Sequence, residues 1–125
     1  LELTRNNKPV SNLREENLLL KPVTQMALAH VALMAQRKEI SWDSVVGKFN
    51  QIDWSFNNEL WFNILVIGSA NKKMITGKDS IRSAGMVIAY MVMGNQMTRS
   101  EVDDVRQIIR NARNDDSATL PRMIP

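Results

Sequence analysis

Three arginines are spaced along one predicted helix as phosphate binding would require. Arg106, Arg110 and Arg113 recur at i, i+4 and i+7, so they line one face of that helix, and Arg99 precedes them. Guanidinium groups in a row match the phosphates along a nucleic-acid backbone. The alternative is a solvated helix face, because acids early and arginines late in a helix are also what its dipole favours. The sequence leaves both interpretations open.

A second basic group lies in a polar loop and at the start of the helix that follows it. It consists of Lys72, Lys73, Lys78 and Arg82. A loop that leads into a helix N-terminus is a natural site for an anion. Asp79 lies in the same place and weakens that interpretation, so an exposed loop without a ligand is the alternative.

The two helices expected at 79–93 and 99–112 could form a helix-turn-helix, with the second helix in the major groove of DNA. Any hairpin of two helices has this pattern. Acidic residues at the start of the second helix would also face phosphates poorly. We therefore prefer an ordinary helical hairpin.

Acid–base chemistry would require a pair such as Asp53 and Glu59. Both positions are explained by the start of a helix, which acidic residues favour. Trp54 and Trp61 could stack on exposed bases, but tryptophans at a helix entry are more often core anchors. We expect no catalytic residue and no enzyme activity in this chain.

The single histidine, His30, lies on an apolar helix and is expected to be a hydrogen-bonded core residue. The chain has no cysteine and no second histidine, so it can form no metal site based on those ligands. No phosphate-binding GxxxxGK[ST] loop is present. We therefore expect neither a metal nor a cofactor.

Composition bounds the class of protein. With 125 residues, 44% of them hydrophobic, the chain suffices for one folded domain. The net charge of +3 is weak support for an anionic partner. No apolar run approaches the roughly 20 residues of a membrane span, so we expect a cytoplasmic protein without a membrane partner. Because the chain begins at Leu1 rather than Met, we expect it to be part of a larger protein.

The apolar periodicity predicts an all-α fold, a compact bundle of four main helices plus short accessory helices. We expect an irregular entry at 1–21, a helical domain at 22–113 and a flexible or docked tail at 114–125. The predicted helices are 22–38, 42–50, 56–67, 79–93 and 99–112. The first is apolar nearly all round, which places it in the centre of the core or at the interface of a homo-oligomer.

Two local signals refine the helical pattern. Thr98-Arg-Ser-Glu101 is a capping box, in which the two side chains satisfy free backbone donors at the start of the last helix. Gly85 lies inside a predicted helix, where glycine costs up to about 1 kcal/mol relative to alanine. Close packing of a neighbouring helix would explain its presence.

The run Ile52-Asp-Trp-Ser-Phe-Asn-Asn-Glu-Leu-Trp61 resembles a segment in the later half of the DndB proteins. Other similarities are the lysine loop, a helix ending near Gly94, the Thr98-x-x-Glu101 start and the opening Leu3-Thr-Arg-Asn-Asn-Lys-Pro-Val10. DndB proteins belong to bacterial DNA phosphorothioation systems and to the broader DGQHR-domain group. The Asp-Gly-Gln-His-Arg motif itself is absent from this chain. The resemblance therefore implies a C-terminal portion of a DNA-binding regulator of DNA sulfur modification genes.

Two functional hypotheses follow. In the first, the domain supports DNA binding through phosphate contacts of its basic residues and helps the protein to self-associate. In the second, it is a protein interaction or oligomerisation module without nucleic-acid contact, because the helix at 22–38 is too apolar for the surface of a small domain.

Overall fold

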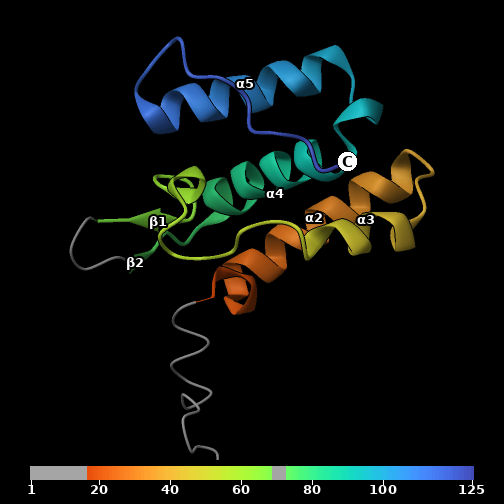
Figure 1. Cartoon of the computed structure of the whole chain (residues 1–125), viewed down its shortest axis with the longest axis horizontal. Helices are drawn as coiled ribbons and strands as arrows, with labels where there is room; N and C mark the ends of the chain where they lie inside the picture. The colour runs from red at the N-terminus through yellow and green to blue at the C-terminus, as the bar shows by residue number, and fades with distance from the viewer. Residues whose placement is uncertain (1–16, 69–72) are drawn as a thin grey trace, which may run out of the picture.

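The computed structural model describes residues 17–68 and 73–125, and it confirms the all-α class with four main helices (Figure 1). The helices are α2 (Pro22–Arg37), α3 (Trp42–Phe49), α4 (Lys78–Met93) and α5 (Arg99–Arg113). Three short 3-10 helices accompany them, η2 (Leu18–Leu20), η3 (Glu59–Trp61) and η4 (Gly94–Gln96). The antiparallel strands β1 (Val66–Ile67) and β2 (Lys73–Met74) form a small hairpin.

Helix α4 is the centre of the bundle, because α2 and α5 both pack against it (Figure 1). Burial on more than one side requires small and apolar residues around most of the helix. Its buried residues are Ser80, Ala84, Gly85, Val87, Ile88, Ala89, Met91, Val92 and Met93. The central position that the sequence suggested for 22–38 therefore belongs to α4.

Helix α2 buries only one stripe and leaves another in contact with solvent. Its buried residues are Val23, Thr24, Ala27, Val31 and Ala35. Met26 is 56% exposed and Leu33 is 44% exposed, and both lie on the opposite side. Of the two alternatives for this helix, the central position does not hold, because α2 packs mainly against one neighbour, α4. The alternative, an oligomer interface, stays a prediction.

Close approach between α2 and α4 explains Gly85, as expected. A Cβ atom added to Gly85 would lie 3.0 Å from the Cβ of His30 and 3.2 Å from the carbonyl oxygen of Ala27. Any side chain would therefore force the helices apart or displace His30. The absence of a side chain allows the two backbones to pack closely.

The capping box at the start of α5 is also confirmed. The Glu101 N–H donates to Thr98 Oγ1 at 3.2 Å, and the Thr98 N–H donates to Glu101 Oε1 at 2.7 Å. Lys38, just beyond α2, donates to the same Oε1 at 2.7 Å. Burial alone would raise the pKa of Glu101, but the hydrogen bonds from Lys38 and Thr98 outweigh it and lower this pKa below the usual glutamate value.

The helix predicted at 56–67 does not form. Asn58 accepts from the Leu60 N–H through its side chain and begins the short η3, and Phe62 is already extended. Asn63 adopts a left-handed conformation with φ 63°. Short polar side chains that bond to nearby backbone compete with helix formation, so the chain turns into β1 instead. Gly68, with φ 101°, follows a strand and does not end a helix.

Both ends of the described chain dock onto the core. The Leu18 N–H donates to the Trp54 carbonyl oxygen at 2.7 Å, and Leu18 is fully buried. After α5, the tail folds back, and the Ile124 N–H donates to the Met91 carbonyl oxygen at 2.7 Å. Of the two possibilities for the tail, the structure shows the docked one. The rest of the predicted entry, residues 1–16, lies outside the described residues.

Gly85→Ala should destabilise the fold by about 1–3 kcal/mol, the usual cost of overpacking, because the added methyl group collides with His30 and Ala27. Gly47→Ala in α3 is the matched control. A Cβ at Gly47 meets nothing within 4 Å, so its helix propensity should stabilise the protein by about 0.5–1 kcal/mol. Urea denaturation of both variants measures the difference. Equal stability of the two variants would contradict the close contact.

Candidate functional site

The Gln51–Trp61 segment is a structural anchor. Trp54 and Trp61 are 7% and 0% exposed, and their rings stack at 5.5 Å with an interplanar angle of 4°. Trp54 Nε1 donates to the Phe49 carbonyl oxygen at 2.9 Å, and Trp61 Nε1 donates to that of Asp53 at 3.0 Å. Neither indole can stack on a base without opening the core, so both tryptophans are core anchors.

The two candidate carboxylates of this segment have backbone roles. Asp53 Oδ1 accepts from the Ser55 N–H at 3.0 Å, which fixes a turn. Glu59 lies in the first turn of η3. Both residues are exposed, and no contact joins the two carboxylates, so the geometry gives no support to an acid–base pair.

The predicted arginine row of α5 is largely engaged by the protein itself. Arg106 Nη1 contacts Asp103 Oδ1 at 2.6 Å, and Arg113 Nη1 donates to the Phe62 carbonyl oxygen at 3.3 Å. Arg110 is half-buried, and its buried Nε has no hydrogen-bond partner among the described residues. Arg99 is exposed at the start of the helix. The structure therefore does not present a row of three free guanidinium groups.

The second basic group is more accessible. Lys73 on β2, Lys78 at the start of α4 and Arg82 one turn later are all exposed. Arg82 Nη2 lies 3.8 Å from Asp104 Oδ2, while the ion pairs of the described residues include neither lysine. Lys72 lies outside the described residues. Asp79 lies in the first turn of α4 between Lys78 and Arg82, as the sequence indicated, and its negative charge partly offsets theirs.

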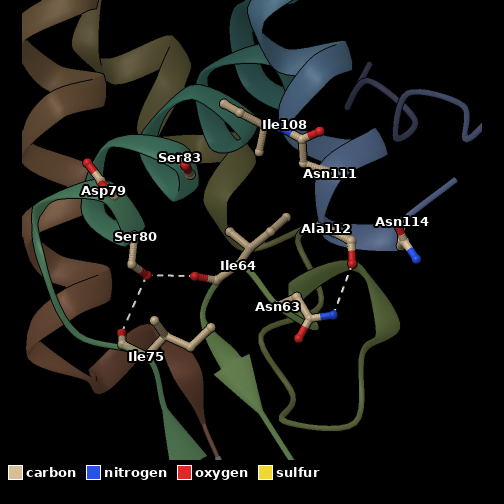
Figure 2. Close-up of a pocket in the computed structure, with 10 residues that line it drawn as sticks. All are labelled: Asn63, Ile64, Ile75, Asp79, Ser80, Ser83, Ile108, Asn111, Ala112 and Asn114. Carbon is tan, nitrogen blue, oxygen red and sulfur yellow. Dashed lines mark hydrogen bonds between the residues drawn. The ribbon is translucent and has the colours of Figure 1, made fainter. Parts of the chain in front are cut away.

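A cleft of about 390 Å³ lies between the turn that precedes β1, the segment from Ile75 to the start of α4, and the end of α5 (Figure 2). Ser80 Oγ donates to the Ile64 carbonyl oxygen at 2.6 Å and lies 3.4 Å from that of Ile75. Asn63 Nδ2 donates to the Ala112 carbonyl oxygen at 2.9 Å. These bonds fix the walls of the cleft, which sequence reasoning missed because its three sides come from segments far apart in the chain.

The lining of this cleft combines apolar side chains with several polar ones. Its side chains include one carboxylate, two hydroxyls and three amides, and its volume lies in the range of small-ligand sites. The polar residues are Asn63, Asp79, Ser80, Ser83, Asn111 and Asn114. No histidine is among the described residues that line it.

A larger cleft of about 620 Å³ separates the Gln51–Leu60 segment from the docked tail. Arg113 and Arg122 line it together with Asp53 and Asp115. Hydrogen bonds from the side chain and backbone of Ser117 lower the pKa of Asp115. Charges of both signs therefore face this space, and they favour neither an anionic nor a cationic ligand.

His30 is not the core residue that the sequence suggested, because its side chain is exposed. It lines a groove between α2 and α4 together with Arg37 and Arg82. The spacing of His30 and Arg37, seven residues on one helix, could have indicated a shared face. Their proximity to Arg82 depends on how α2 packs on α4, so no local pattern could have predicted it.

No significant similarity was found between the chain and any protein-family model, curated protein or solved structure. The likeness to the DndB proteins therefore stays a prediction from the residues quoted above. Over residues 17–68 and 73–125, no helix is long and apolar enough to cross a membrane. The same part of the chain contains no group of three or more side chains that could hold a metal ion.

Ser80→Ala should lower the free energy of unfolding by about 1–3 kcal/mol, because it removes the buried donor to the Ile64 carbonyl oxygen. Ser83→Ala, on the same wall of the cleft, should change stability by less than about 0.5 kcal/mol. Thermal and urea unfolding compare the two variants. If both variants lose the same free energy of unfolding, the Ser80 hydrogen bond does not hold the hairpin to α4.

Proposed function

We propose that this chain is a helical C-terminal part of a cytoplasmic DNA-binding regulator of DNA sulfur modification genes. The Ile52–Trp61 run and the Thr98-x-x-Glu101 start support the proposal through their resemblance to DndB proteins. The net charge of +3 is compatible with an anionic partner. The chain would stabilise the regulator on DNA through phosphate contacts, without reading bases.

The observation that carries DNA contact is the accessibility of Lys73 and Lys78. Both are exposed, neither takes part in an ion pair of the described residues, and they flank the N-terminus of α4. The dipole of α4 adds positive potential at that end. Arg82 and Arg99 are further exposed cations. Arg106 and Arg113 would first have to leave the contacts described above, and Arg110 is half-buried.

Replacing Lys73 and Lys78 together by glutamine should weaken binding to promoter DNA of the sulfur modification genes. Each lost phosphate contact should reduce the magnitude of the slope of log affinity against log salt concentration by about one. The slope of the double variant should therefore be smaller in magnitude by about two. An electrophoretic shift titration over a range of salt concentrations measures this slope. The control Lys21→Gln/Arg122→Gln removes the same charge elsewhere and should keep the wild-type slope. Absence of binding by the wild type, or equal slopes for both variants, would refute phosphate contact here.

Self-association through α2 is a second candidate, because the apolar side chains of Met26 and Leu33 are exposed on the same side of the helix. Contiguous apolar surface on a small domain often marks an interaction site. Such an interface would also hold two copies of a regulator on DNA. It is compatible with the phosphate contacts, which lie at the N-terminus of α4.

Met26→Glu should abolish a dimer formed in this way, because it places a charge in an apolar interface. Light scattering over a range of protein concentrations gives the mass directly. The control Ile67→Glu introduces the same charge at a residue that is 52% exposed on β1, and it should leave the dimer intact. A wild-type mass that stays at 14.2 kDa would exclude self-association by this chain.

A further inference from the structure

A groove lies between α2 and α4 on the face that carries the exposed stripe of α2. Its volume is about 180 Å³. Helix α2 contributes His30, Leu33, Met34 and Arg37, and α4 contributes Arg82 and Met86. Gly85 forms its floor, where α4 approaches His30 and Ala27 closely. None of the side chains that line the groove is acidic.

The cations of the groove are accessible to a ligand. Arg37 is exposed at the end of α2 and takes part in no ion pair of the described residues. Arg82 lies 3.8 Å from Asp104, but the two side chains are 59% and 52% exposed. An ion pair that long and that exposed contributes little to stability, so Arg82 can exchange Asp104 for another carboxylate at small cost.

The size of the groove favours side chains of a larger partner over a small molecule. Small-molecule sites usually have about 300–1,000 Å³, so a volume of 180 Å³ is too small for a ligand that is buried as a whole. It suits one or two side chains that belong to a larger partner. Leu33, Met34 and Met86 offer an apolar surface to such side chains, and methionines adapt their shape to what they bind.

We propose that this groove docks an acidic amphipathic helix of a partner protein. Apolar side chains of that helix would lie on Leu33, Met34 and Met86, and its carboxylates would pair with Arg37 and Arg82. Guanidinium groups bind carboxylates in two parallel hydrogen bonds, and helices that lie in grooves place such anchors at regular spacing. A nucleic acid satisfies the arginines equally well, but its phosphates leave the apolar side chains without a partner. This inference goes beyond DNA contact and does not depend on Lys73 or Lys78.

His30 offers a direct measurement, because it is the only histidine in the chain and it lines the groove. The probe is a synthetic helical peptide with leucines along one face and glutamates beside them. Its addition should shift the imidazole proton resonances of His30 until they saturate. A peptide of the same composition in scrambled order, which keeps the charge but not the apolar face, should shift them far less.

Arg37→Gln/Arg82→Gln should weaken this binding by about tenfold or more, since both carboxylate contacts are lost. Lys73→Gln/Lys78→Gln removes the same charge outside the groove and should bind the peptide as the wild type does. Leu33→Gln should weaken binding without a change of charge. All exchanged side chains are exposed, and circular dichroism melting confirms that the variants fold.

Several results would overturn the proposal. The first is a shift of the His30 resonances by the scrambled peptide as large as that by the amphipathic peptide. The second is equal weakening of peptide binding in Arg37→Gln/Arg82→Gln and Lys73→Gln/Lys78→Gln. The third is no shift of the His30 resonances by either peptide. A shift of His30 by duplex DNA but not by the peptide would assign the groove to nucleic acid instead. The DNA proposal is tested separately through Lys73 and Lys78, so failure of one proposal leaves the other standing.

Discussion

The close contact of α2 with α4 at Gly85 is the constraint on which the rest of the structure depends. Because Gly85 has no side chain, the Cβ of His30 and the backbone of Ala27 come within van der Waals distance of α4. This contact makes α4 the central helix, and α5 and the docked tail complete its burial on the other side. The same contact fixes the position of the groove between α2 and α4 that Arg37 and Arg82 line.

The helical part of the fold could be predicted because its signals are local. The capping box at Thr98 and the proline at the start of α2 depend only on neighbouring residues, and the structure contains both helix starts. The segment at 56–67 has helical apolar spacing, yet Asn58 and Asn63 form bonds within turns and β1 pairs with β2. That outcome depends on pairing with a strand beyond the loop, which the apolar spacing within 56–67 does not reveal.

For the candidate sites, too, local features could be predicted from the sequence, whereas contacts between distant segments could not. The spacing of Arg106, Arg110 and Arg113 correctly places them on one helix, but spacing does not tell whether a guanidinium group is free. Asp103 could be recognised as a partner for Arg106 from sequence, three residues away, whereas the Phe62 carbonyl oxygen that accepts from Arg113 comes from a distant loop. His30 appeared to be a core residue because its helix is apolar, and only the packing direction of α2 reveals that it faces solvent.

The Glu101 carboxylate joins two parts of the chain that are otherwise separate. One oxygen accepts from the backbone at the start of α5 and from Lys38 beyond the end of α2. A local opening of the first turn of α5 therefore also releases the lysine that follows α2, so the two helix ends open as one unit rather than fraying independently. The connection between α4 and α5 is thereby restrained by Lys38, which lies sixty-three positions before Glu101 in the chain.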